Sequence, residues 1–119
     1  MDVFANVYRS AIAVTPQMPF WEWLNTIDLS VSVTLEELQA DAHIYLVPDF
    51  EDEPDIEKAM DEFLQDNFEH IFVNELSGWW LDEAVYPEIS YPLFLEWFTY
   101  KKHSMIFDML DEELEKEES

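Results

Sequence analysis

Carboxylates are the residues of this chain with the greatest potential for chemistry. Asp and Glu number 28 against 5 Lys and Arg, which gives a formal net charge of -23. A surface this negative attracts basic proteins and divalent cations. We therefore expect a small acidic intracellular binding or regulatory module that engages a basic protein partner through an acidic loop and the helix after it. The carboxylates expected to bind the partner are Asp49, Glu51, Asp52, Glu53, Asp55, Glu57, Asp61, Glu62 and Asp66.

The segment from Glu75 to Glu83 is a second candidate site, because two adjacent tryptophans stand there beside the only glycine. Trp79 and Trp80 follow Gly78 directly, at the end of a predicted strand, where sheets with crossover helices usually hold ligands. Two neighbouring Trp side chains cannot both point inward from regular structure. We therefore expect one ring to cover the sheet edge and the other to anchor the partner. A purely structural role for both rings is the alternative.

The competing hypothesis is a small metal-dependent or hydrolytic enzyme that uses Asp82, Glu83 and His103. His43, His70 and His103 each lie near the start of a predicted strand, so a largely parallel sheet would let them approach one another around a metal ion. However, the sequence contains no His-x-x-x-His pair, EF-hand loop or nucleophile elbow. We predict no catalytic residue and no metal site, and isolated histidines are the simpler interpretation.

Composition excludes several other kinds of chemistry. The absence of Cys rules out disulfides, thiolate-bound metals and thiol nucleophiles, and a single Gly leaves no glycine-rich phosphate loop, so we expect no cofactor. Basic residues are too few for direct binding to nucleic acid or to an anionic membrane. No apolar stretch approaches the roughly 18 residues that span a bilayer, and the first residues lack the basic start of a signal peptide. We expect a soluble cytoplasmic protein, and its oligomeric state stays open.

Apolar periodicity places the candidate residues on strands and helices that alternate along the chain. Strands are predicted at residues 3–14, 29–33, 42–47, 71–76 and 104–110. Helices are predicted after Thr15, for a brief turn after Thr34, from Pro54 to about Phe68, and from Ser90 to Tyr100. The alternation implies crossover connections, so we predict an α+β domain with a mixed sheet of four to five strands and about three helices packed mainly on one face. The nearly continuous apolar run 42–47 is expected in the middle of the sheet.

Side-chain capping signals indicate where three of these helices begin. Thr15 precedes a proline that suits the first helical position, Thr34 and Glu37 form a capping box, and Ser90 is the third N-cap. In the helix from Pro54, apolar residues recur three and four positions apart and the acids occupy the other face. Like charges four residues apart destabilise that helix slightly, so packing against the rest of the domain has to hold it.

One globular domain over residues 1–110 is the predicted organisation, followed by an acidic tail over residues 111–119. A chain of 119 residues removes roughly two-thirds of its unfolded surface from water, which is enough for a core without disulfides. The tail has a single Leu among its charged residues. We therefore expect it to be solvated and disordered.

The second half of the chain resembles a set of small acidic bacterial proteins. The strings that carry the resemblance are GWWLDEAVYP, FLEWF and HSMIFD, and the upstream HIYLVPDFEDEPDIEKAMDEFL is similar to them as well. The family has no assigned activity. The resemblance implies a bacterial, intracellular, single-domain protein and carries over no catalytic residue.

Overall fold

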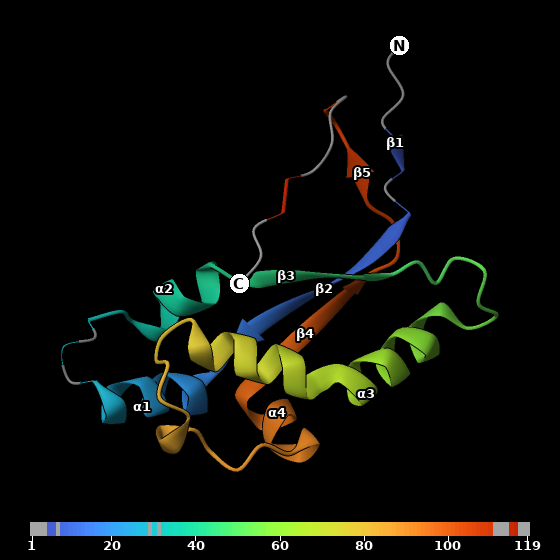
Figure 1. The fold of residues 1–119 in the computed structure, drawn as a ribbon. Helices are drawn as coiled ribbons and strands as arrows, with labels where there is room; N and C mark the ends of the chain where they lie inside the picture. Colours follow the sequence, from blue (N-terminus) through green and yellow to red (C-terminus); the bar gives the residue numbers. More distant parts are fainter. Residues whose placement is uncertain (1–4, 7, 29, 31, 111–114, 117–119) are drawn as a thin grey trace.

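A three-stranded antiparallel sheet positions the other elements of the molecule (Figure 1). The computed structural model describes residues 5–6, 8–28, 30, 32–110 and 115–116. In the sheet, β2 (Arg9–Pro16) is the central strand, between β3 (His43–Pro48) and β4 (Phe98–His103). Two short strands, β1 (Ala5–Asn6) and β5 (Phe107–Asp108), form a separate antiparallel ladder.

The described residues form four α-helices and one short 3-10 helix. They are α1 (Met18–Ile27), α2 (Leu35–Ala40), α3 (Ile56–Ser77), α4 (Tyr91–Trp97) and the 3-10 helix η1 (Glu83–Val85). In Figure 1, α1, α3 and α4 lie together on one side of the sheet. Among the described residues, no helix has the length and apolarity needed to cross a membrane.

Alternation along β2 separates a helix-facing side of the sheet from an outer side. Ser10, Ile12 and Val14 are fully enclosed, because successive side chains of a strand point to opposite faces and these residues point toward the helices. Aromatic rings complete the core, and Phe72 of α3 packs edge-on against Phe98 with ring centroids 5.3 Å apart. Each fully buried ring contributes about 1.5–3 kcal/mol, which holds the acidic helix α3 against the sheet.

Among the described residues, the three strands place no acidic side chain on the outer side of the sheet. It is formed by the alternate residues of the three strands, and three of them are basic or histidine: Arg9, Lys101 and His103. The strand register gives the complete set as Arg9, Ala11, Ala13, Thr15, Ile44, Leu46, Pro48, Thr99, Lys101 and His103. The excess of acids in the chain therefore does not extend to this face.

The predicted α+β class is confirmed, but the sheet differs from the one expected. It has three strands instead of four or five, and every pair is antiparallel, so the prediction of a mixed sheet is wrong. β3 is an edge strand and not the middle of the sheet. Its apolar run is continuous because Tyr45 and Val47 face the helices while Ile44 and Leu46 are exposed on the outer side.

Residues 71–76, predicted as a strand, form the last turns of α3. Ile71, Phe72, Glu75 and Leu76 are the buried residues of this stretch, and their spacing of three and four positions places them on one helical face. A short apolar run does not by itself distinguish a strand from a buried helix. As a result, the helix predicted to stop near Phe68 continues to Ser77.

The sequence pattern does not predict β4 as a strand. The helix predicted through Tyr100 ends at Trp97, and Phe98 already has extended backbone angles (φ -139°, ψ 147°). The next residues pair with β2 along its whole second half. The predicted strand 104–110 is reduced to the two residues of β5.

Two of the three predicted N-caps are confirmed. The hydroxyls of Thr34 and Ser90 each accept a hydrogen bond from the backbone N–H three residues later, at 3.1 and 3.3 Å. The prediction for Thr15 is wrong, because this residue still pairs with β4 as part of β2. Gln17 takes the N-cap of α1 without a side-chain hydrogen bond.

Three predicted segments fall partly outside the described residues. Of the strand predicted at 3–14, residues 5–6 form β1 and residues 9–14 belong to β2, which continues to Pro16, whereas Tyr8 lies in a bend between them. Of the strand predicted at 29–33, the described residues 30, 32 and 33 are not in a strand. Of the tail 111–119, only residues 115–116 are described, so its predicted disorder stays a prediction.

Candidate functional site

Two carboxylates of α3 connect this helix to the edge strands of the sheet. Asp61 and Glu75 lie about four helical turns apart on the side of α3 that faces the sheet. Asp61 contacts β4, and Glu75 contacts β3. Each carboxylate meets a tyrosine and a basic residue placed two positions apart on its strand, where both side chains point to the same face.

Asp61 is bound by Tyr100 and Lys102. The Tyr100 hydroxyl donates to Oδ1 at 2.9 Å, and the Lys102 ammonium donates to Oδ2 at 3.2 Å. Burial, followed by the hydrogen bond to Asp61, raises the pKa of the Tyr100 phenol. The side chain of Asp61 is nevertheless 44% exposed. Asp61 was predicted as a partner-binding residue, but it already has a cationic partner within the chain.

Glu75 is bound by His43 and Tyr45 and is almost fully enclosed, with 4% of its side chain exposed. His43 Nδ1 lies 2.7 Å from Oε2, and the Tyr45 hydroxyl donates to the same oxygen. An ionised carboxylate only accepts, so Nδ1 carries the proton of this contact when Glu75 is ionised. Asn74 Nδ2 donates to the Tyr45 hydroxyl at 2.9 Å. Burial, followed by the hydrogen bond to Glu75, raises the pKa of the Tyr45 phenol.

The second oxygen of Glu75 has no hydrogen bond from the described residues. Both of the contacts above reach Oε2, and Oε1 receives none. The described part of the chain contains no fully enclosed side-chain oxygen or nitrogen without a partner. Oε1 therefore keeps an open side, and Glu75 lines the pocket described next.

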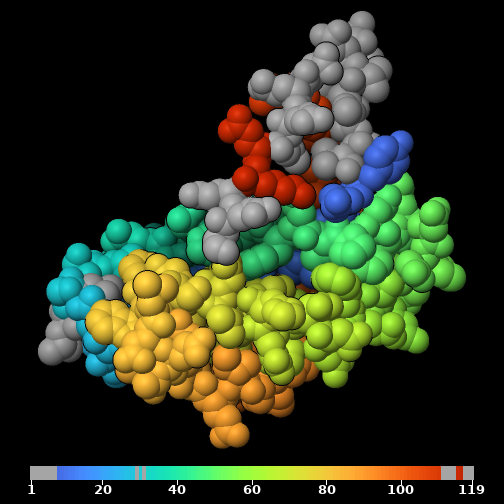
Figure 2. Space-filling view, in the orientation of Figure 1, coloured from blue at the N-terminus to red at the C-terminus, as the bar shows by residue number. Residues whose placement is uncertain are grey.

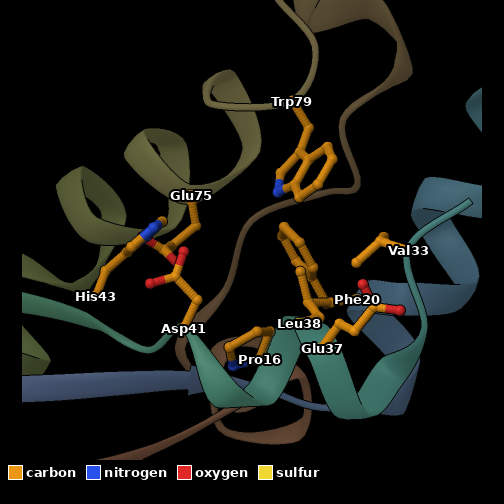
Figure 3. Close-up of a pocket in the computed structure, with 9 residues that line it drawn as sticks. All are labelled: Pro16, Phe20, Val33, Glu37, Leu38, Asp41, His43, Glu75 and Trp79. Atoms are coloured by element: carbon orange, nitrogen blue, oxygen red, sulfur yellow. The ribbon is translucent and has the colours of Figure 1, made fainter. Parts of the chain in front are cut away.

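A pocket of about 220 Å³ lies between the end of α3, the α2 helix and the start of β3 (Figure 3). We call it the Glu75 pocket. Its lining residues are Pro16, Phe20, Val33, Glu37, Leu38, Asp41, His43, Glu75 and Trp79. Figure 3 shows Asp41, His43 and Glu75 gathered on one side and Trp79 with Phe20 on the other. The pocket thus joins a carboxylate-rich wall to an aromatic wall.

The end of α3 brings Trp79 over this pocket. Trp79 and Trp80 N–H both donate to the carbonyl of Leu76, at 3.1 and 3.0 Å, which turns the chain out of the helix. Trp79 and Trp80 are 41% and 36% exposed, so their exposure alone does not distinguish a covering tryptophan from an anchoring one. Gly78 has an ordinary helical φ of -63°, so the only glycine is not required by the backbone geometry.

The remaining predicted acidic residues lie in the loop before α3 and along the first half of that helix. Asp49 and Asp55 accept backbone hydrogen bonds and fix the loop and the helix start. The Phe50 ring packs on Phe63 at 5.7 Å between centroids, which attaches the loop to α3. Six others are exposed and make no ion pair with the described residues, and we call them the acidic surface: Glu51, Asp52, Glu53, Glu57, Glu62 and Asp66.

The acidic surface and the two tryptophans do not form one compact site. α3 has 22 residues, so at 1.5 Å per residue about 33 Å separate its ends. Residues of α3, yellow-green to yellow in Figure 2, form most of the lower front of the molecule. The outward side of the helix is therefore accessible along its length.

The residues of the enzyme hypothesis are not brought together. Asp82 caps η1 by accepting from the Ala84 N–H at 3.0 Å, and η1 is attached to α1 by the bond from Trp23 Nε1 to the Val85 carbonyl. His103 pairs with Ala11 near the other end of β2 from α1. The described residues contain no group of three or more His, Asp or Glu side chains placed to hold a metal ion.

No protein-family model, curated protein or solved structure matches this chain. The resemblance to small acidic bacterial proteins therefore stays a prediction. We therefore infer function from the geometry of the acidic surface and of the Glu75 pocket.

Sequence reasoning named Glu75 only as the edge of a candidate segment and did not predict its partners. The signal was present: Glu75 interrupts the apolar side of a run that packs as a helix, between Phe72 and Leu76. A carboxylate on a buried face has to find a donor. His43 and Tyr45, two positions apart on one strand face, are the donors it finds.

Proposed function

We propose that this protein is a binding module that engages a basic protein partner through its acidic surface. The proposal is supported chiefly by the one-sided distribution of charge. The acidic surface lies on the helical side, whereas the described residues of the three strands place no acid on the outer side of the sheet, which carries Arg9, Lys101 and His103. A basic partner is attracted to the first side and repelled by the second.

Lys58 lies within the acidic surface and lines one shallow hollow together with Glu53 and Glu62, but a single ammonium group does not neutralise six carboxylates. Among the described residues, Lys102 is used by Asp61, and no Lys or Arg forms an ion pair with the six carboxylates of the acidic surface. Their negative potential therefore extends into solvent, where it speeds the encounter with a positively charged protein. Such rim charges act mainly on association rate and salt dependence.

The length of α3 suits an extended partner segment. The outward face of α3 is about 33 Å long, with the carboxylates of the acidic surface along its first half and Val73 and Leu81 exposed near its other end. A standard protein interface buries roughly 800 Å² per partner. A basic helix or strand lying along α3 would pair its cations at one end and bury apolar contacts at the other.

Matched charge neutralisation tests this proposal. A short oligolysine peptide is the probe, titrated at about 50 mM and about 300 mM salt. One variant removes four charges of the acidic surface: Glu53→Gln, Glu57→Gln, Glu62→Gln and Asp66→Asn. The control removes four exposed charges elsewhere and has the same net charge: Glu22→Gln, Glu36→Gln, Glu88→Gln and Glu96→Gln.

The surface variant is expected to weaken oligolysine binding about tenfold or more, and the control much less, with both effects shrinking at high salt. Equal weakening by the two variants would mean that net charge alone attracts the probe. That result, or no binding at low salt, would contradict the proposal.

A further inference from the structure

The described residues that line the Glu75 pocket include three carboxylates and no Lys or Arg. Glu37, Asp41 and Glu75 supply the negative charge, and His43 is the one residue of this described lining that can offset part of it. A carboxylate held away from bulk water interacts more strongly with a cation than an exposed one does. The pocket therefore favours cations and rejects anions.

Glu75 contributes an acceptor that is not committed to the fold. Its side chain is almost enclosed, both of its hydrogen bonds reach Oε2, and Oε1 accepts none from the described residues. Because Oε1 keeps an open side, it can still accept a hydrogen bond. A ligand N–H placed in the pocket would donate that bond.

The shape of the pocket favours an organic cation over a metal ion. The described part of the chain has no set of three His, Asp or Glu side chains placed around one ion, the pocket included. Trp79 and Phe20 line the wall across from Asp41 and Glu75, and Glu37 lies on the side of Phe20 (Figure 3). An indole face attracts ammonium and guanidinium groups. The volume of about 220 Å³ is below the roughly 300 Å³ at which pockets for drug-sized ligands begin, so it suits a single side chain.

We propose that the Glu75 pocket binds the ammonium or guanidinium end of a Lys or Arg side chain, with its alkyl stem between Trp79 and Phe20 and its N–H groups directed at Glu75 and Asp41. This inference rests on the proposed function for the source of that side chain. It makes the C-terminal end of α3 a specific contact for a partner that the acidic surface attracts.

Titration of the full chain, labelled with ¹⁵N, tests the inference. The probes are Nα-acetyl-lysine amide and Nα-acetyl-arginine amide. Nα-acetyl-norleucine amide has the same apolar body without the charge, and butylamine represents a free amine. The charged amino-acid probes are expected to shift the Trp79 indole and the backbone of Asp41 and His43, and the norleucine probe is expected to leave them unchanged.

Variants separate recognition from folding. Trp79→Leu and Asp41→Asn change exposed side chains and are expected to weaken binding about threefold to thirtyfold. Glu75→Gln is expected to abolish it, and Asp61→Asn is the matched control that leaves it unchanged. If Glu75→Gln does not fold, the first two variants still decide the question.

Equal shifts with the norleucine probe, or unchanged affinity in both Trp79→Leu and Asp41→Asn, would overturn the inference. Saturation by butylamine without a response to the lysine and arginine probes would also overturn it, since the ligand would then be a free amine. The two proposals fail separately. If oligolysine binds but the lysine and arginine probes cause no chemical-shift changes at the pocket, only the pocket inference is overturned. If these probes cause the changes but oligolysine does not bind, only the acidic-surface proposal is overturned.

Discussion

The two carboxylates that connect α3 to the sheet use the same arrangement in different surroundings. Asp61 meets Tyr100 and Lys102 on β4, and Glu75 meets His43 and Tyr45 on β3. Asp61 is close to half exposed and pairs with a permanently charged ammonium, whereas Glu75 is enclosed and pairs with an imidazole. The first contact is solvated, and the second forms one wall of a pocket.

The difference shows why counting acids does not locate a site. Exposed carboxylates such as those of the acidic surface and Asp61 gain little from any single partner, because water and salt screen them. Removing a carboxylate from water costs free energy unless hydrogen-bond donors replace the water, so the surrounding residues have to supply those donors. In this chain, the exposed carboxylates of the acidic surface lie in the loop before α3 and along its first half, whereas the enclosed carboxylate of Glu75 lies near the other end of the helix.

Neutralising Glu75 should lower the free energy of unfolding much more than neutralising Asp61. Glu75→Gln is expected to lower the free energy of unfolding by about 2–3 kcal/mol, because it weakens two hydrogen bonds to an enclosed charged group. Asp61→Asn should cost about 1 kcal/mol or less, as expected for an exposed ion pair. Urea denaturation of both variants measures this, and equal losses would mean that burial does not distinguish the two ends.

High pH should affect both ends through their tyrosines. Folding raises the pKa of Tyr45 and of Tyr100 above the usual value near 10, so the folded state holds these protons more tightly than the unfolded state. The stabilisation is present below about pH 10 and is lost as the pH rises above it. The urea midpoint should therefore fall as the pH rises above about 10.

Phenylalanine variants test whether Tyr45 and Tyr100 cause this loss of stability at high pH. Tyr45→Phe and Tyr100→Phe should each reduce the fall in the urea midpoint, because Phe has no proton to lose. Tyr45→Phe should reduce it more, since Tyr45 is the more deeply buried of the two phenols. A fall that persists unchanged in the double variant would show that other groups cause it.

The smallest expected effect on stability is that of a substitution at Gly78, which lies at the same end of α3 as Glu75. A Cβ added there would meet only the carbonyl oxygens of Asn74 and Glu75, at an ordinary 3.6 Å, and φ is already helical. Gly78→Ala should leave the structure unchanged and stabilise it by up to about 1 kcal/mol, because the unfolded chain loses freedom. A destabilisation in thermal or urea unfolding would indicate that this end of α3 is generally fragile, and the effect of Glu75→Gln would lose its specificity.

Some features of this fold could be predicted from the sequence, and others could not. The caps at Thr34 and Ser90, the apolar face of α3 and the α+β class were predictable, because each depends on residues close together in the chain. The strand assignment of 71–76 failed because the apolar periodicity of six residues is ambiguous. β4 was missed because the aromatic pattern of α4 continues into it, and only pairing with β2 decides where the helix ends.

The candidate site was predicted in part for the same reason. Trp79 and Glu75 belong to a segment that the sequence singles out, but its position at a strand end was wrong. The contacts of Glu75 with His43 and Tyr45 join residues about 30 positions apart. They depend on the pairing of the edge strand β3 with the central strand β2. No local pattern contains that information, since strand order follows from the packing of the whole chain.

The central claim is that a basic partner binds the helical side of the molecule and avoids the outer side of the sheet. The most direct measurement is amide chemical-shift mapping of the ¹⁵N-labelled chain with an oligolysine peptide at low salt. The account predicts shifts across residues 49–66 and at Trp79, with Ala13, Thr99 and Lys101 unchanged. Shifts of similar size on those three sheet residues, or none along α3, would contradict it.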